Sequence, residues 1–170
     1  MKVFVLGTGR CGTTTFAKAC SHITNYTSGH ETRAGSLDLG YPDNHIEVDP
    51  HLFWNLNTLV LDPNVAFVHL IREKETCVAS LASRASTANL WIPFVYQKKN
   101  PDRSDILTAA SRYYDFVNDA ITGFLKGYMN RMVFRLGEPK GDWECFWNRI
   151  GAEGEYFAAL QEFTIRHNAR

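Results

Sequence analysis

The sequence predicts an α/β fold in which a small, mostly parallel sheet of about four to five strands lies between layers of helices. Short apolar runs rich in β-branched residues, typical of strands buried on both faces, occur at residues 3–6, 65–71 and 132–136. Stretches with helical spacing separate these runs, and strands separated by helices form parallel sheets. A chain of 170 residues is expected to form one domain, residues 1–170.

The remaining elements follow in order along the chain. A short second strand is expected at residues 26–29, and irregular segments at residues 34–44 and 89–103. The second of these segments holds the aromatic side chains of Trp91, Phe94 and Tyr96. Helices are predicted over residues 16–23, 50–61, 73–88, 104–128, 142–150 and 155–167, and in the longest of them apolar residues recur every three or four positions.

Composition limits the kinds of partner. Lys and Arg together number 18, as do Asp and Glu, so no broad nucleic-acid-binding surface is expected. The sequence shows neither a signal peptide nor an apolar run of membrane-spanning length. We therefore expect a cytoplasmic protein with no membrane or nucleic-acid partner. Its four cysteines lack zinc-site spacing and are expected to be reduced thiols: Cys11, Cys20, Cys77 and Cys145.

A glycine-rich loop follows the first strand. Gly7, Gly9 and Gly12 let the backbone approach an anion, and the following helix N-terminus supplies partial positive charge. Gly7 and Gly12 have the spacing of the nucleoside-triphosphate loop G-x-x-x-x-G-K-S/T, but Thr13 replaces its lysine. The absence of this lysine argues against an ordinary kinase or NTPase. The positive charge of the loop is instead carried by Arg10. The loop predicts an anion site on a P-loop NTPase-like three-layer sandwich, and a glycine turn without ligand is the alternative.

The segment Arg-Cys-Gly-Thr-Thr that starts at Arg10 resembles the phosphosulfate-binding loop of sulfotransferases, which typically reads K/R-S/C-G-T-T. A second family signature is a strand that ends in Arg with a Ser eight residues later, here Arg72 and Ser80. In the family both hold the 3′-phosphate of 3′-phosphoadenosine 5′-phosphosulfate (PAPS). Arg84 follows Ser80 by four residues, and this Ser-x-x-x-Arg spacing also resembles that of some members. The resemblance implies that PAPS is bound by Thr8, Gly9, Arg10, Cys11, Gly12, Thr13, Thr14, Arg72, Ser80 and Arg84.

A Glu-Thr-Arg segment begins at Glu31, 21 residues after Arg10. It resembles the segment of protein-tyrosine sulfotransferases whose glutamate is the catalytic base. The resemblance implies that Glu31 deprotonates the acceptor and that Arg33 orients the acceptor or Glu31. Cytosolic sulfotransferases use a histidine in roughly this region, so His51 is a second candidate base. The alternative is an ordinary surface pair of Glu31 and Arg33.

Two family features are missing. Many members carry a lysine before the middle strand that stabilises the leaving group, whereas residues 45–51 contain none. Arg10 would then carry this charge alone, or His51 would assist it. Thr15 stands where cytosolic members have an aromatic residue that stacks on adenine. Trp91 and Phe94 are candidates for that contact, with core packing as their alternative role.

The expected function is that of a PAPS-dependent sulfotransferase. It would move a sulfuryl group to a hydroxyl of a small molecule, a glycan or a tyrosine and release adenosine 3′,5′-bisphosphate (PAP). The catalytic candidates are Arg10, Glu31 and His51. No metal is expected, because no carboxylate cluster evident in the sequence suits Mg²⁺. Two alternatives stay open: a nucleotide or small-molecule kinase with a degenerate P-loop, and a non-catalytic nucleotide-binding module.

Overall fold

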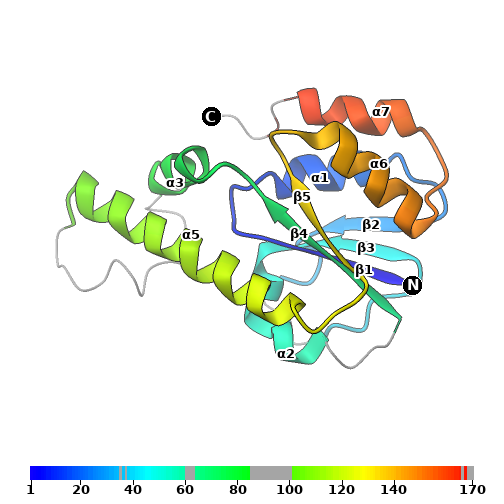
Figure 1. Cartoon of the computed structure of the whole chain (residues 1–170), viewed down its shortest axis with the longest axis horizontal. Helices are drawn as coiled ribbons and strands as arrows, with labels where there is room; N and C mark the ends of the chain where they lie inside the picture. The colour runs from blue at the N-terminus through cyan, green and yellow to red at the C-terminus, as the bar shows by residue number, and fades with distance from the viewer. Residues whose placement is uncertain (35, 37, 60–63, 85–100, 166, 168–170) are drawn as a thin grey trace.

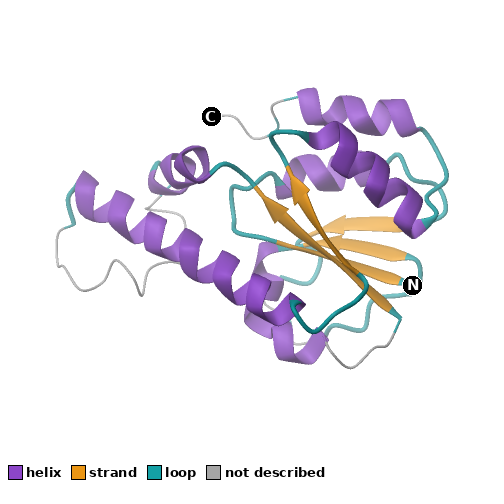
Figure 2. Cartoon of the chain, viewed as in Figure 1, coloured by secondary structure: helices purple, strands orange, loops and turns teal. Residues whose placement is uncertain are grey.

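The computed structural model describes residues 1–34, 36, 38–59, 64–84, 101–165 and 167. Within these ranges the chain folds as a parallel sheet between two layers of helices (Figures 1 and 2), so the predicted α/β class is confirmed. The aromatic segment with Trp91, Phe94 and Tyr96 lies outside the described residues.

The sheet has five strands, all parallel, in the order β2-β3-β1-β4-β5. From β1 the chain goes to the edge strand β2, comes back to β3 beside β1, and then crosses to β4 and β5 on the other side. The connections that leave the neighbouring strands β1 and β4 therefore run in opposite directions. In open α/β sheets ligands bind beyond the carboxyl ends of the strands at such a reversal, and this is where the glycine loop lies. The strands are β1 (Lys2–Leu6), β2 (Thr27–His30), β3 (His45–Val48), β4 (Val65–Ile71) and β5 (Arg131–Arg135).

Helices cover both faces of the sheet (Figure 1). One layer holds α1 (Thr13–Cys20), α6 (Pro139–Ile150), α7 (Tyr156–Gln161) and the short 3-10 helix η3 (Glu162–Thr164). The other holds η1 (Pro50–Asn55), α2 (Leu56–Leu59) and the long α5 (Arg103–Leu125), with α3 (Lys74–Ala82) packed against α5. None of the helices described here combines the length and the apolar character needed to cross a bilayer.

Aromatic side chains form the core between the sheet and the layer that contains α1. Phe16 of α1 packs edge-on against Phe134 of β5, with 4.9 Å between ring centroids, and against Phe146 of α6, at 5.2 Å. Trp143 lies 5.2 Å from Phe163, which belongs to η3. The C-terminal segment is therefore anchored to the core by Phe163, and its position matters for the site described below.

The structure corrects several predicted boundaries. Residues 45–48, for which no element was predicted, form strand β3. The first helix begins at Thr13 rather than residue 16, because Gly12 takes a left-handed conformation with φ of 101° and turns the chain directly into the helix. Helix α3 ends at Ala82 instead of continuing to residue 88, so Arg84 lies beyond the helix. Asp49 caps η1 by accepting the backbone N–H of His51, as its place before Pro50 predicted.

Truncation of the aromatic core should destabilise the protein strongly. We expect Phe146→Ala to lower the free energy of unfolding by about 3 to 5 kcal/mol, because Phe146 is fully buried and its removal leaves a cavity. Urea denaturation measures this change. The matched control is Phe157→Ala, since Phe157 is 78% exposed and should change stability little. Equal losses for the two variants would contradict the assignment of the core.

Candidate functional site

The site is built around the loop between β1 and α1. Gly7 passes directly against β4: a Cβ atom there would lie 2.6 Å from the carbonyl oxygen of Leu70 and 2.8 Å from the sulfur of Cys11. Two later residues, Arg10 and Gly12, adopt left-handed backbone conformations, with φ of 69° and 101°. These left-handed residues curl the loop, and α1 then starts without a side-chain cap on its first N–H groups.

Two buried cysteine side chains, Cys11 and Cys77, pack in or against the loop. The sulfur of Cys77, on α3, lies 3.4 Å from Thr8 Oγ1 and 3.6 Å from the carbonyl oxygen of Gly9. All four cysteines are free. Burial raises the pKa of the Cys11 and Cys77 thiols, so both stay neutral and serve as small packing groups. The loop is therefore fixed by α3 as well as by the strands.

Three arginines meet beside the loop. Arg10 Nε donates to Ser80 Oγ at 3.1 Å, and the guanidinium of Arg72 donates to the carbonyl oxygen of Arg10 at 3.2 Å. Burial lowers the pKa of Arg10, and the positive charges of Arg84 and Arg72 lower it further. Like charges held this close repel one another, and a bound anion relieves this repulsion. The group of Arg10, Arg72, Arg84 and Ser80 is called the arginine group below.

A cavity of about 930 Å³ lies beside the arginine group. The first turn of α1, from Thr13 to Thr15, lines it next to Arg10. Its wall also includes apolar side chains from the end of β5 and from the C-terminal segment, namely Leu136, Phe163 and Ile165. A cationic wall together with an apolar wall suits a ligand with anionic groups and a flat, apolar-faced ring.

Acidic side chains also border this cavity, but one of them is committed to the backbone. The carboxylate of Glu73 accepts the N–H groups of Glu75 at 3.1 Å and Thr76 at 2.8 Å, which caps the start of α3. This carboxylate therefore serves the helix N-terminus, where negative charge is favourable. Arg72, the residue before it, ends the β4 segment and reaches the loop instead.

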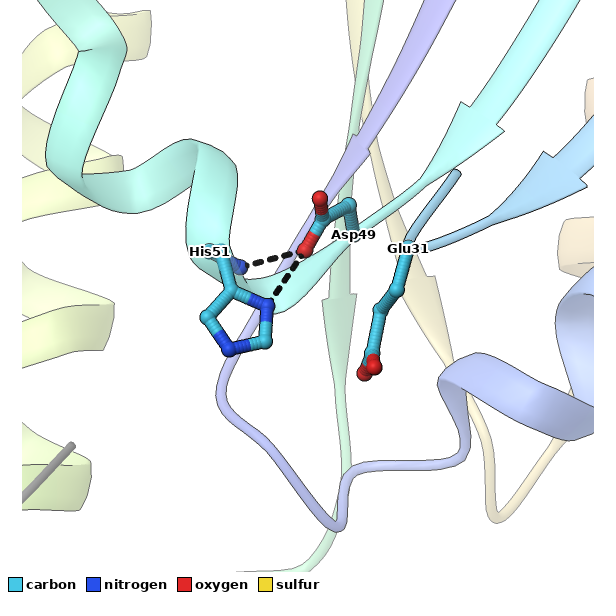
Figure 3. Close-up of side chains that lie close together, drawn as sticks. All are labelled: Glu31, Asp49 and His51. Atoms are coloured by element: carbon cyan, nitrogen blue, oxygen red, sulfur yellow. Dashed lines mark hydrogen bonds and ion pairs between the residues drawn. The ribbon is translucent and has the colours of Figure 1, made fainter. Parts of the chain in front are cut away.

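A second group of side chains lies at the carboxyl ends of β2 and β3 (Figure 3). It consists of Glu31, Asp49 and His51, whose nearest ligand atoms all lie within 4.8 Å of one another. Asp49 Oδ1 accepts the backbone N–H of His51 at 2.7 Å and lies 2.8 Å from its Nδ1. The hydrogen bond to Asp49 raises the pKa of His51; burial opposes this, and the charge of Glu31 adds to it. We call these three residues the carboxylate–imidazole group.

The structure brings together two carboxylates whose proximity was not evident in the sequence. Glu31 and Asp49 are 18 residues apart in the sequence and meet only because β2 and β3 are parallel neighbours. Two carboxylates and one imidazole can accept protons, and they could also hold a divalent cation. Both possibilities bear on the reaction proposed below.

Buried hydrogen bonds fix the turn that carries Glu31. Glu31 itself is left-handed, with φ of 55°. Thr32 donates its backbone N–H to Glu47 Oε1 at 2.8 Å and its hydroxyl to Glu47 Oε2 at 2.6 Å. Glu47 is completely buried in β3, and His45 Nε2 lies 2.9 Å from the same Oε2. Thr32 therefore anchors the Glu-Thr-Arg turn to the sheet.

His30 connects the two groups. Its Nε2 lies 2.9 Å from the hydroxyl oxygen of Thr13, in the first turn of α1. The same nitrogen lies 3.7 Å from Glu31 Oε1. Thr13, which replaces the lysine of a triphosphate loop, thus faces the cavity on one side and contacts the strand that leads to Glu31.

The residues predicted from the sequence do not all lie together in the structure. The cavity is lined by Arg10, Gly12, Thr13, Thr14, Arg72, Ser80 and Arg84. Thr8, Gly9 and Cys11 lie in the loop but not in the cavity lining, and Glu31 and His51 belong to the carboxylate–imidazole group. Arg33 pairs with Asp38 and lies 4.9 Å over the ring of Tyr41. Candidate adenine contacts Trp91 and Phe94 lie outside the described residues.

Sequence reasoning missed Asp49, His30 and Thr15 as site residues. A signal for Asp49 was available, because it follows two apolar residues, Ile46 and Val48, that alternate as in a strand. His45 and Glu47 obscured that strand, since buried strands rarely carry two ionisable residues. Both are buried here because each has a hydrogen-bonding partner.

Removal of the Thr32 hydroxyl should destabilise the turn. We expect Thr32→Val to cost about 1 to 3 kcal/mol of unfolding free energy, because the buried Glu47 carboxylate loses a hydrogen-bond donor. Urea unfolding measures the loss. Thr58→Val is the matched control, since Thr58 donates only to the exposed carbonyl of Asn55. A Thr32→Val loss no greater than that of the control would show that Thr32 does not anchor the turn.

Comparison with models of known protein families gives no match for this chain. Comparison with curated proteins gives no match either. The functional conclusion therefore depends on the residues of the site and on their geometry.

Proposed function

We propose that the protein is a sulfotransferase that uses PAPS as donor and a hydroxyl as acceptor. The arginine group is the observation that carries this proposal. PAPS has phosphate groups at its 3′ and 5′ ends, and the chain offers cationic or N–H donors for both. A guanidinium binds a phosphate dianion through two parallel hydrogen bonds, and a hydroxyl adds a third.

The phosphates and the adenine of PAPS would each contact a different set of residues. Arg72, Ser80 and Arg84 would hold the 3′-phosphate, and the loop N–H groups with the α1 N-terminus would hold the 5′-phosphosulfate. Arg10, which belongs to the loop and donates to Ser80, would stabilise the charge that develops on the bridging oxygen as sulfur leaves it. The adenine ring would lie against the apolar wall formed by Leu136, Phe163 and Ile165.

The acceptor would approach from the side of the carboxylate–imidazole group. Glu31 or His51 would take the hydroxyl proton as the oxygen attacks sulfur. Trp54 lies three residues after His51 in the 3-10 helix η1, where side chains three apart share a face. Trp54 is 51% exposed, and an exposed aromatic next to the base favours a phenolic acceptor such as tyrosine.

A kinase with a degenerate loop is the second candidate, and one observation favours it. Glu31, Asp49 and His51 could hold Mg²⁺ at the edge of the sheet where phosphoryl-transfer enzymes bind it. Thr13 argues against this candidate, because a triphosphate loop needs a lysine at that place. The two functions differ in the nucleotide that they bind and in their need for a metal.

Calorimetry with PAP tests the nucleotide assignment. We expect saturable binding of PAP in the presence of EDTA, and we expect Arg72→Ala to weaken it by about 10- to 100-fold through loss of charged hydrogen bonds. Arg149→Ala is the matched control, because Arg149 is exposed on α6 and does not line the cavity. Binding of ATP with Mg²⁺ but not of PAP would reject the sulfotransferase and favour the kinase.

Substitution in the carboxylate–imidazole group should separate binding from turnover. We expect Glu31→Gln and His51→Gln to keep the PAP affinity of the wild type, since neither residue lines the cavity. Both variants should lower kcat for transfer of labelled sulfate from PAPS to 4-nitrophenol or a tyrosine peptide, by up to about 10⁴-fold for the residue that is the base. Unchanged turnover in both variants would remove this group from the reaction.

A further inference from the structure

We propose that Asp49 is the positioning residue that makes His51, through its Nε2 atom, the proton acceptor of the reaction. This inference rests on the proposed function and assigns a role to a residue that no sequence motif singled out. One oxygen of Asp49 contacts both the backbone nitrogen and the ring Nδ1 of His51, at 2.7 and 2.8 Å. Two contacts from one atom fix the ring relative to its own backbone.

The contact to Asp49 determines which ring nitrogen can act as a base. A carboxylate accepts a hydrogen bond only from a nitrogen that bears a proton. In the neutral ring Nδ1 therefore carries the proton and Nε2 keeps its lone pair. Figure 3 shows Nε2 on the side of the ring turned away from Asp49. The carboxylate of Glu31 points in the same general direction, toward the loop that follows β1. Nε2 is thus the ring atom that remains able to accept a proton.

Burial distinguishes the two carboxylates. Asp49 is 2% exposed and ends β3, where it also caps η1, so its position is fixed by the sheet and by the helix. The Glu31 side chain is 37% exposed and stands on a left-handed residue. A rigid, buried carboxylate suits the positioning of an imidazole, and a more exposed one suits a supporting charge.

The charges around the ring favour the protonated product of the step. Asp49 and Glu31 both stabilise the imidazolium. Of the described elements that contact η1, residues 3–6 of β1 are apolar and α2 has no ionisable side chain. Helix α5, which contacts Phe53 through Phe116, carries Arg112, Asp115 and Asp119 within about one turn of Phe116. The positive charge that His51 gains during the reaction is therefore balanced by two carboxylates.

The acceptor oxygen forms a bond to sulfur while the bond from sulfur to the bridging oxygen of PAPS breaks. The electron pair of that bond leaves with the 5′-phosphate of PAP, and the acceptor proton moves to His51 Nε2. The imidazolium returns the proton to water after the products leave, and Asp49 holds the ring in place throughout.

Nuclear magnetic resonance of ¹⁵N-labelled histidines tests the pair itself, without any substrate and in the presence of EDTA. In the wild type we expect His51 to be protonated at Nδ1 when neutral, with a pKa above that of an ordinary histidine. Asp49→Asn preserves the shape and the helix cap but removes the charge, so the pKa of His51 should fall. The His51→Gln spectrum assigns the signal. A neutral His51 protonated at Nε2, or a pKa unmoved by Asp49→Asn, would overturn the proposal.

Kinetics test the role of the pair in the reaction. We expect Asp49→Asn to lower kcat on the order of 100-fold, with KM for PAPS and PAP affinity unchanged. The loss of activity at low pH should move to lower pH, because a base with a lower pKa is protonated only there. Asp102→Asn, the same substitution at the exposed cap of α5, should leave kcat, the pH profile and the His51 signal unchanged.

The outcomes separate the two proposals. An unaltered kcat in Asp49→Asn, with transfer activity present in the wild type, would overturn the role of Asp49 and leave the sulfotransferase intact. A wild type that shows the expected His51 signal but transfers no sulfate from PAPS to any hydroxyl would overturn the proposed function and, with it, the catalytic role of the pair.

Discussion

The close approach of Gly7 to strand β4 is the constraint on which the rest of the site depends. A side chain at this position would overlap the carbonyl of Leu70, so only glycine lets the loop run against the strand. Because the loop lies there, the carbonyl of Arg10 reaches Arg72 at the end of the β4 segment, and the Arg10 side chain reaches Ser80 on α3. One missing Cβ atom thereby brings together the parts of the arginine group.

The site has two chemically distinct sides. The arginine group and the first turn of α1 offer positive charge and N–H donors, which suits binding of phosphates. The carboxylate–imidazole group offers proton acceptors at the ends of β2 and β3. His30 joins the sides through its contact with Thr13. A group-transfer enzyme needs this division, because the donor must be held by positive charge while the acceptor must lose a proton.

Buried polar residues maintain this arrangement. Burial of a carboxylate is costly unless hydrogen bonds replace its water shell. Glu47 accepts two hydrogen bonds from Thr32 and lies beside His45. Asp49 accepts the backbone N–H of His51 and contacts its ring Nδ1. These bonds fix the two turns that carry Glu31 and His51. The chain thus places ionisable side chains in and beside its sheet, where an apolar residue would pack more easily, at the points that orient the site.

The sequence by itself determined the α/β class and the glycine loop, and it singled out Arg72 and Ser80, which both line the cavity. These features are local, because a strand, a tight turn and a helix N-terminus depend on neighbouring residues. Only the tertiary structure decided the rest. Strand β3 was missed, since His45 and Glu47 obscure the alternation of Ile46 and Val48 and are compatible with burial through partners on β2 and its turn. The contact between Asp49 and His51, their proximity to Glu31, and the wall that Phe163 and Ile165 form beside Arg10 join segments distant in sequence. Such contacts are set by the order in which parallel strands assemble, and no local pattern encodes that order.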